Sequence, residues 1–266
     1  MTEYAIGAVL SDVDGTQIRH GHSLPSPEVQ AAARGLREHG IPLLEVTARP
    51  HALIKKLIEP LDLRDNLCTL DGGATVAQAD SGEVLWSHWL NSETTWTIVS
   101  AIGRLCTDVH FFDKSSQRRK PLELVIGHEG DETSAIGAPS VFAIFGVERG
   151  TEIVEALGTV TGIGHTPVMR YEDSEALRCI QVFNTGVNKQ YGIVQMLRLA
   201  GLTDQRLLAI GDGTNDLSLF AAAGENGIRV AMGNAPDELK DLADWVAPPV
   251  EDHGFAVAME RYRLLA

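Results

Sequence analysis

Short apolar runs alternate with amphipathic segments in the N-terminal part of the chain. Three of these runs end in polar or turn-forming residues and predict buried strands: Ala5–Ser11, Pro42–Val46 and Leu67–Leu70. Ser26-Pro27 predicts the start of a helix that ends near Gly40, and Pro50 predicts the start of a second helix that runs to about Leu61. Strands and helices that alternate in this way form a parallel, doubly wound sheet, whose functional edge lies at the carboxyl ends of the strands.

The pattern changes between residues 83 and 184, where predicted strands outnumber predicted helices. The predicted strands are Val84–Ser87, Val109–Asp113, Leu122–Ile126, Val141–Phe145, Val168–Tyr171 and Cys179–Phe183. The predicted helices are Ser92–Leu105 and Thr151–Leu157. Adjacent strands with few helices predict an α+β insert with an antiparallel sheet, and its core is expected to contain Trp86, Trp89 and Trp96.

The alternation of helix and strand returns after Val187. The predicted elements are a helix at Asn188–Ala200, a strand at Arg206–Ile210, a helix at Asn215–Ala223, strands at Ile228–Ala231 and Trp245–Ala247, and a helix from Phe255. The sequence therefore predicts an α/β protein with a Rossmann-like core domain, formed by residues 1–82 and 185–266. An α+β cap domain at residues 83–184 is expected to interrupt this core.

Charge and composition narrow the classes of partner. A net charge of −14 over 266 residues argues against a nucleic-acid-binding face, which needs clustered Lys and Arg; the short basic run Arg118–Lys120 is interpreted as a solvated loop. No apolar stretch is long enough to span a membrane, and Met1–Ile6 lacks the pattern of a secretory signal. Cys68, Cys106 and Cys179 are isolated and interpreted as reduced, buried thiols, so a cytoplasmic protein is expected.

Two acidic clusters follow predicted strands: Asp12-Val13-Asp14-Gly15-Thr16 and Gly211-Asp212-Gly213-Thr214-Asn215-Asp216. Because the carboxyl ends of parallel strands converge on one edge of a sheet, the two clusters are expected to meet there. Carboxylates that lie close together repel each other unless a cation binds them, and Mg²⁺ prefers carboxylate and phosphate oxygens. We therefore predict a Mg²⁺ site formed by Asp12, Asp14, Asp212 and Asp216.

The same residues supply the groups that phosphoryl transfer needs. Asp12 is the predicted nucleophile, because a carboxylate can form an aspartyl-phosphate that water later opens. Asp14 is the predicted acid for the leaving oxygen and afterwards the base for the attacking water. Thr47, the backbone N–H groups near Gly15, and the ammonium group of Lys189 are expected to bind the phosphate oxygens.

Over most of its length, the sequence resembles the haloacid dehalogenase superfamily of phosphatases, which use an aspartate nucleophile. Four motifs carry the resemblance: Asp-x-Asp-Gly-Thr at Asp12–Thr16, a strand-end Thr at Thr47, a Lys at a helix start at Lys189, and Gly-Asp-Gly-x-Asn-Asp at Gly211–Asp216. An insert between the second and third motifs is similar to the Cof-type branch, as are the segments Asp71–Ala74 and Ala231–Ala235.

The resemblance implies a Mg²⁺-dependent phosphatase for a small phosphorylated metabolite, often a sugar phosphate. It also implies that Asn215 helps to order the phosphate site and that Asn234 lies near it. The chain departs from the family pattern at two places. Thr47-Ala48-Arg49 replaces the usual Thr-Gly-Arg, and Gln17 occupies a position where an apolar residue is common.

Two other functions remain open from the sequence. A phosphotransferase or phosphomutase, such as a phosphomannomutase, shares the roles of Asp12 and Asp14 but keeps the phosphoryl group away from water. Release of inorganic phosphate separates that activity from a phosphatase. The second alternative is a non-catalytic module that binds metal or phosphate, although every catalytic position of the family is filled.

Overall fold

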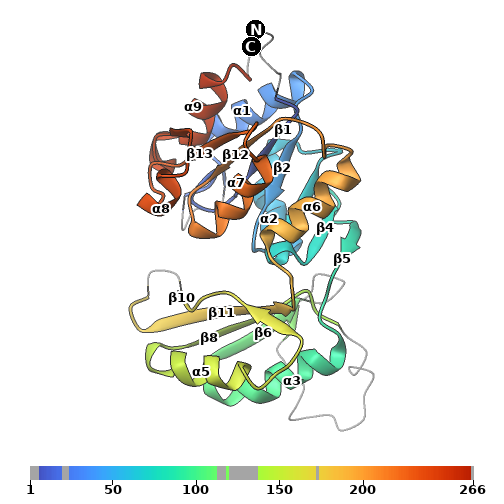
Figure 1. Cartoon of the computed structure of the whole chain (residues 1–266), viewed down its shortest axis with the longest axis vertical. Helices are drawn as coiled ribbons and strands as arrows, with labels where there is room; N and C mark the ends of the chain where they lie inside the picture. Colours follow the sequence, from blue (N-terminus) through green and yellow to red (C-terminus); the bar gives the residue numbers. More distant parts are fainter. Residues whose placement is uncertain (1–5, 20–23, 113–117, 120–136, 172–173, 265–266) are drawn as a thin grey trace. The chain divides into compact units, whose positions relative to one another are not determined.

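The computed structural model describes residues 6–19, 24–112, 118–119, 137–171 and 174–264 (Figure 1). The chain divides into two compact units. Met1–Trp86 and Asn188–Ala266 form the core unit, and Ser87–Val187 form the inserted unit. The predicted α/β fold class is confirmed. In the part of the chain that the structure describes, no helix is long and apolar enough to cross a membrane.

The core unit is built on a sheet of eight described strands in the order β14-β13-β12-β1-β2-β3-β4-β5. Their bounds are β1 (Ala8–Ser11), β2 (Leu43–Val46), β3 (Leu67–Leu70), β4 (Thr75–Gln78), β5 (Val84–Ser87), β12 (Leu207–Gly211), β13 (Ile228–Ala231) and β14 (Trp245–Val246). The strands from β14 to β3 run parallel, whereas β4 runs antiparallel to β3. Because β1 lies between β12 and β2, the carboxyl ends of these three strands are neighbours.

Helices cover both faces of the core sheet (Figure 1). One face is covered by α1 (Pro27–Glu38), α2 (His51–Ile58) and α9 (Gly254–Arg261), and the other by α6 (Lys189–Ala200), α7 (Leu217–Ala223) and α8 (Asp237–Lys240). The alternation of side chains along β1 produces both cores: Val9 joins the first hydrophobic cluster, whereas Ala8 and Leu10 join the second. This arrangement is the predicted doubly wound layering.

Local capping explains where two of these helices begin. The Ser26 hydroxyl accepts the N–H of Val29 at 3.3 Å and starts α1, as its sequence predicts. The Asn188 side chain accepts the N–H of Tyr191 at 2.8 Å and starts α6, which ends at Gly201 in the left-handed conformation. The cap on α6 is important for the site, because it places Lys189 in the first turn of that helix.

One strand that the sequence analysis assigned to the cap domain belongs to the core sheet. β5 pairs beside β4, and the Trp86 ring packs against the core unit, with its centroid 5.3 Å from that of Tyr191. The core unit therefore continues to Trp86 rather than ending at residue 82. Trp96 does pack in the inserted unit as expected. An apolar edge strand has the same sequence pattern whichever sheet it joins, so the pattern alone misassigned it.

The inserted unit is an antiparallel sheet with helices packed against it. Its described strands are β6 (Asp108–Phe112), β7 (Arg118–Arg119), β8 (Val141–Gly146), β9 (Ile163–His165), β10 (Met169–Arg170) and β11 (Leu177–Asn184). α3 (Ser92–Ile102) and α5 (Gly150–Leu157) contribute to one hydrophobic cluster with this sheet. The predicted strand Leu122–Ile126 lies outside the described residues.

Three details of the sequence analysis need correction. The basic run was expected to be a loop, but Arg118–Arg119 pairs with β6 as a short strand. β9 has no counterpart among the predicted strands, because Ile163–His165 is too short and too rich in Gly to show a strand pattern. All three cysteines are free, but only Cys68 and Cys179 are buried, whereas Cys106 is half-buried.

Candidate active site

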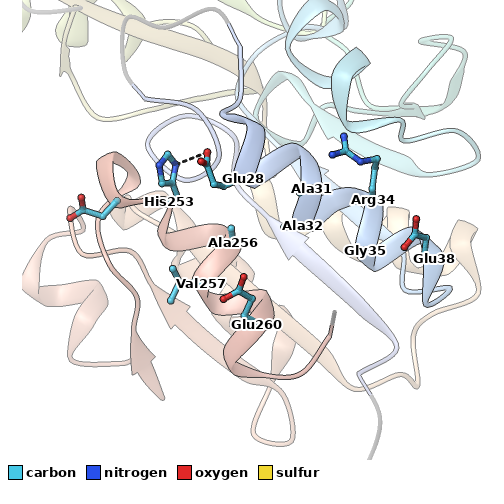
Figure 2. A pocket seen from close by; sticks show the side chains of 11 residues that line it. Glu28, Ala31, Ala32, Arg34, Gly35, Glu38, His253, Ala256, Val257 and Glu260 are labelled. Carbon is cyan, nitrogen blue, oxygen red and sulfur yellow. Dashed lines mark ion pairs between the residues drawn. The ribbon is translucent and has the colours of Figure 1, made fainter. Parts of the chain in front are cut away.

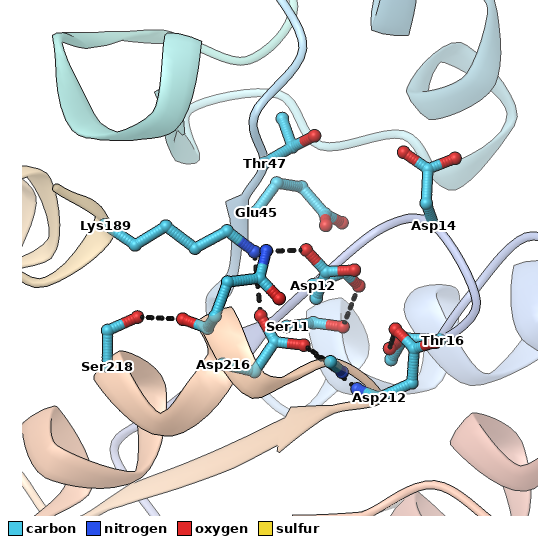
Figure 3. A network of polar contacts seen from close by, with 12 residues as sticks. Ser11, Asp12, Asp14, Thr16, Glu45, Thr47, Lys189, Asp212, Asp216 and Ser218 are labelled. Atoms are coloured by element: carbon cyan, nitrogen blue, oxygen red, sulfur yellow. Dashed lines mark hydrogen bonds and ion pairs between the residues drawn. The ribbon is translucent and has the colours of Figure 1, made fainter. Parts of the chain in front are cut away.

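The ends of three neighbouring strands bring the predicted catalytic residues together. Asp12 directly follows β1, Thr47 directly follows β2, and Asp212 directly follows β12. Lys189 reaches this edge from the first turn of α6, and Asp216 reaches it from the turn that precedes α7 (Figure 3). The two acidic clusters, which are distant in sequence, therefore meet as predicted.

Lys189 lies between two buried carboxylates. Its Nζ atom donates to Oδ1 of Asp12 at 2.6 Å and to Oδ1 of Asp216 at 2.7 Å (Figure 3). Burial alone lowers the pKa of Lys189, but the charges of Asp12 and Asp216 outweigh it and raise that pKa above its ordinary value. Lys189 is therefore a permanently charged ammonium group that holds the Asp12 carboxylate in a fixed position.

The Asp12 carboxylate experiences opposing electrostatic effects. Burial and the nearby Asp216 charge raise the pKa of Asp12 well above its usual value, while Lys189 lowers it and Asp212 raises it further. Three carboxylates face one ammonium group, so the site carries excess negative charge. This charge balance favours an additional cation at the site.

Asp216 also organises the backbone of the fourth motif. Its Oδ2 atom accepts the N–H groups of Asp212 at 3.0 Å and of Gly213 at 2.9 Å. Since Oδ1 already binds Lys189, both oxygens of this fully buried carboxylate have protein partners. Asp216 thus shapes the turn that carries Asp212 and fixes the position of Lys189.

Asp212 is packed directly against the first motif. A Cβ atom placed on Gly15 would lie 2.1 Å from Oδ2 of Asp212, and Gly15 has a φ of +77°. Only glycine fits here, both sterically and conformationally. The Asn234 amide bridges the two motifs, since its Nδ2 atom donates to the Gly15 carbonyl at 2.9 Å and to Asp212 Oδ2 at 3.1 Å. Thr16 donates to the other oxygen, Oδ1, at 3.4 Å.

Three carboxylates are arranged in a way that fits a hard dication. Asp12, Asp212 and Asp216 each offer an oxygen, and these atoms lie within 4.8 Å of one another. An all-oxygen donor set with excess negative charge is the chemistry that Mg²⁺ prefers. Asp12 and Asp212 are the better ligands of the three, because Asp216 accepts hydrogen bonds of 2.7 to 3.0 Å on both oxygens, whereas the hydrogen bonds that Asp212 accepts are longer, at 3.1 and 3.4 Å.

The carboxylate of Asp14 lies outside this group of three. Arg49 donates to it through two nitrogens, Nε to Oδ2 at 2.7 Å and Nη2 to Oδ1 at 2.5 Å. The expectation that the Asp14 carboxylate lies with the metal-binding set is therefore not met in this structure. Its two-pronged ion pair with Arg49 instead holds it beside the second motif, where it remains partly exposed.

The predicted phosphate-binding residues occupy different environments. Thr47 is buried, and its Oγ1 atom accepts the N–H of Arg49 at 3.1 Å, which leaves the hydroxyl proton available to an incoming oxygen. Asn215 is exposed on the turn before α7. The contact of phosphate with backbone N–H groups near Gly15 stays a prediction; the N–H of Gly15 itself donates to the Ile18 carbonyl at 2.8 Å within its own loop. Gly15 contributes the close approach to Asp212 instead.

The Asp71-Gly72-Gly73 turn packs against two segments that carry site residues, a role that the sequence did not indicate. A Cβ atom on Gly73 would lie 2.0 Å from the Asn188 carbonyl, so the turn packs directly against the start of α6. The N–H groups of Asp71 and Gly72 donate to the carbonyls of Arg49 at 3.1 Å and Thr47 at 3.2 Å. One turn thus fixes both the second motif and the helix that carries Lys189. An Asp-Gly-Gly sequence signals a turn but not its packing partner.

The core unit also has a groove of about 510 Å³ away from these motifs (Figure 2). It lies between α1 and α9, and its floor consists of small residues, including Ala31, Gly35 and Ala256. His253 pairs with Glu28 at its rim, with 3.4 Å between Nδ1 and Oε2. None of the predicted catalytic residues lines it, so the groove is separate from the candidate active site.

Comparison with known proteins identifies the family. The profile of the haloacid dehalogenase-like hydrolases matches residues 9–117 and 167–259. The chain belongs to this family, and within it to the Cof-type phosphatases; it is a phosphoric monoester hydrolase.

Individual relatives agree with this assignment. The phosphatase YwpJ of Bacillus subtilis is 25% identical over 285 residues, which cover 94% of this chain and 97% of that protein. The phosphoglycolate phosphatase of Methanoculleus marisnigri is 36% identical, but only over 83 residues, 31% of this chain and 34% of that protein. A solved structure of a HAD subclass IIB sugar phosphatase superposes with a TM-score of 0.73 at 20% identity, covering 97% of this chain and 99% of that one.

Proposed function

We propose that this protein is a Mg²⁺-dependent phosphatase that hydrolyses a small phosphorylated metabolite, a sugar phosphate, through an aspartyl-phosphate on Asp12. The observation that carries the proposal is the position of the Asp12 carboxylate. It is held by Lys189 at 2.6 Å and lies beside Asp212 and Asp216 in a set of oxygens suited to a dication. A carboxylate fixed in this way is pre-oriented for attack on phosphorus.

The reaction follows from the residues around Asp12. One Asp12 oxygen forms a bond to phosphorus while the bond from phosphorus to the leaving oxygen breaks. Asp14, in its acid form, donates a proton to that leaving oxygen. Asp14 then accepts a proton from water as the water attacks the phosphorus of the aspartyl-phosphate. Inorganic phosphate leaves, and the Asp12 carboxylate is restored.

The surrounding groups stabilise charge on the transferring phosphoryl group. The Lys189 ammonium group lies 2.6 Å from Asp12, and the Thr47 hydroxyl has a free proton to donate. Asp12 and Asp212, with Asp216 nearby, would hold Mg²⁺, which would supply positive charge toward the phosphate oxygens. In this structure Asp14 is a carboxylate paired with Arg49 through two hydrogen bonds, so it leaves Arg49 and takes up a proton before it acts as the acid.

Two findings support a small metabolite as the substrate. A structural neighbour is a sugar phosphatase, and a relative that is 25% identical over 94% of this chain is the HMP-PP phosphatase of Cronobacter sakazakii. The strongly negative net charge of −14 also disfavours polyanionic substrates such as nucleic acids. A phosphorylated sugar carries few charges, and a metal ion and one lysine can neutralise them.

The test is phosphate release from a panel of sugar phosphates, nucleotides and cofactor phosphates, with and without Mg²⁺. The wild type is compared with Asp12→Asn, which preserves the shape of the side chain but removes the nucleophilic charge. Turnover that requires Mg²⁺ and is lost in Asp12→Asn supports the proposal. Substantial turnover by Asp12→Asn contradicts it. Transfer of the phosphoryl group to a second sugar without phosphate release would instead identify a phosphotransferase or phosphomutase.

A further inference from the structure

Three buried polar side chains lie beside the proposed nucleophile. Ser11 is the last residue of β1, Glu45 is its partner in the register of β2, and Gln17 belongs to the loop after the first motif. Ser11 and Glu45 are fully buried, and Gln17 is 2% exposed. Figure 3 shows Ser11 and Glu45 close to Asp12. The proposed chemistry uses none of the three.

The Gln17 amide links these residues to one another. Its Nε2 atom donates to Glu45 Oε2 at 2.7 Å and to Ser11 Oγ at 2.8 Å. A longer contact of 3.4 Å joins the same nitrogen to the backbone carbonyl of Asp12. Ser11 Oγ in turn donates to that carbonyl at 2.8 Å. The Asp12 carbonyl is therefore fixed by two side chains just beyond the last residue of β1.

Gln17 and Glu45 each have one side-chain oxygen that makes no hydrogen bond to the described residues. Among the described buried side-chain atoms, Gln17 Oε1 and Glu45 Oε1 are two of the three without a hydrogen-bond partner. Burial raises the pKa of Glu45 to about 8, only partly offset by the hydrogen bond from Gln17, so its carboxyl group is neutral at neutral pH. The hydrogen bond from Gln17 Nε2 to Glu45 Oε2 is the contact that joins the two side chains.

Packing alone does not explain a buried amide and a buried acid at these positions. Glu45 stands in a strand whose other residues, Leu43, Leu44 and Val46, are apolar, and two apolar side chains here would avoid the cost of burying polar groups. Gln17 is likewise buried, at 2% exposure, and donates to Glu45. The two polar side chains therefore contact each other, and Gln17 also contacts the backbone of the proposed nucleophile.

We propose that Gln17 and Glu45 form a positioning pair, in which Glu45 accepts a hydrogen bond from the Gln17 amide and holds that amide where it orients the Asp12 carbonyl, directly and through Ser11. By holding the Asp12 backbone, the pair sets the direction in which the Asp12 side chain projects from the end of β1. This inference rests on the proposed role of Asp12 as the nucleophile. Gln17 and Glu45 act through Ser11 and the Asp12 backbone and do not contact the reacting phosphoryl group.

The test compares four variants with the wild type: Gln17→Leu, Glu45→Leu, the double variant Gln17→Leu/Glu45→Leu, and Glu45→Gln. Each is assayed for kcat and KM with para-nitrophenyl phosphate and Mg²⁺, and for thermal stability. Gln17→Leu and Glu45→Leu each remove a hydrogen-bond partner from a buried polar group, so both stability and kcat should fall. The fall in kcat should be about tenfold to a hundredfold at little-changed KM, the range for a misplaced catalytic group.

The double variant separates positioning from packing. It removes both polar groups, so its thermal stability should return to the wild-type value or exceed it. Its kcat should stay low, because the Asp12 carbonyl has lost the Gln17 amide. Glu45→Gln keeps one acceptor and one donor toward Gln17 and should retain most of the wild-type kcat. A double variant that recovers both stability and kcat would overturn the proposal and leave the pair a packing feature.

Binding of beryllium fluoride supplies a readout that needs no turnover. This compound bonds to an aspartate oxygen as a phosphoryl group does, and fluorine NMR in the presence of Mg²⁺ measures the bound fraction. The double variant should bind it more weakly than the wild type and Glu45→Gln, and equal binding contradicts the positioning role. If the wild type neither turns over any phosphate ester nor binds beryllium fluoride, the proposed nucleophile itself fails, which is a different result from failure of the pair.

Discussion

The Nζ atom of Lys189 lies 2.6 Å from Oδ1 of Asp12 and 2.7 Å from Oδ1 of Asp216, and all three side chains are buried. One ammonium group therefore compensates two carboxylates in a site that water barely reaches. Such a lysine has two roles at once: it stabilises the folded state of the core unit, and it fixes the nucleophile.

Replacing this lysine by an apolar side chain of similar length should damage both roles. In Lys189→Met, two buried carboxylates lose their cation, which costs about 3 to 5 kcal/mol of unfolding free energy for a broken buried ion pair. Urea denaturation at neutral pH without Mg²⁺ measures this loss, and phosphatase activity should be abolished. Added Mg²⁺ should restore part of the stability, because it binds the same oxygens. Unchanged stability would show that Lys189 contributes little to the balance of charge.

The proposed acid, Asp14, predicts a dependence on the leaving group. Asp14→Asn removes the proton donor, so hydrolysis of an alkyl phosphate such as a sugar phosphate should fall by about a hundredfold or more. para-Nitrophenyl phosphate has a leaving group that departs without full protonation, so its hydrolysis should fall much less. The comparison is made as kcat/KM for the two substrates, which reports formation of the aspartyl-phosphate and not its later hydrolysis, where Asp14 acts as the base. Equal losses on both would mean that Asp14 does not protonate the leaving oxygen.

The sequence predicted that Asp12 and Asp212 would lie at the same edge of the sheet, whereas it did not predict the partner of Asp14. A strand that ends in Asp-x-Asp, read with the rule for parallel sheets, places Asp12 at the same edge as Asp212. The ion pair between Asp14 and Arg49 depends on which way two flexible side chains turn, and residue spacing carries no information about that. Ala48 replaces the glycine that is usual in the second motif. The replacement costs little, because the backbone at Ala48 does not have a positive φ, so glycine is not required there.

Contacts that depend on tertiary packing could not be predicted from the sequence either. Trp86 was assigned to the wrong unit because an edge strand looks alike in either sheet. The sequence showed Gln17 only as a polar residue at a position expected to be apolar. Its contacts with Ser11 and Glu45 depend on the register of β1 and β2, which places Glu45 opposite Ser11. Gly15 was expected at the phosphate site, but the contact that requires glycine there is with the nearby Asp212 side chain, and its own N–H donates to the Ile18 carbonyl.

The contact between Gly15 and Asp212 can be tested with a matched control in the same unit. Gly15 and Gly40 both have positive φ, +77° and +66°, but a Cβ atom on Gly40 meets nothing within 4 Å. Gly40→Ala should therefore cost only the strain of a left-handed alanine, about 1 to 2 kcal/mol, and leave turnover unchanged. Gly15→Ala should add a clash with Asp212, raise the Mg²⁺ concentration needed for half-maximal activity, and lower kcat. Equal effects of the two substitutions on turnover would remove the argument for close approach.

Asp71 gives a prediction about pH. Burial raises its pKa from 3.8 to about 7, with a smaller opposing effect from the Thr75 hydroxyl, which donates to Oδ2 at 2.8 Å. A raised pKa means that the folded state holds a proton that the unfolded state releases between these two values. The contribution of Asp71 is therefore fully present below about pH 4 and is lost as pH rises toward 7, at about 1.4 kcal/mol per pH unit.

Asp71→Asn removes that titration while keeping the shape of the side chain and its tolerance of the left-handed backbone, which has a φ of 52° at this residue. The difference in unfolding free energy between Asp71→Asn and the wild type should move in favour of the variant as pH rises from about 4 to 7, and should level off above that range. Urea denaturation at several pH values measures it. A difference that stays constant over this range would show that the Asp71 carboxyl group ionises normally, and that the turn behind Lys189 tolerates a buried charge.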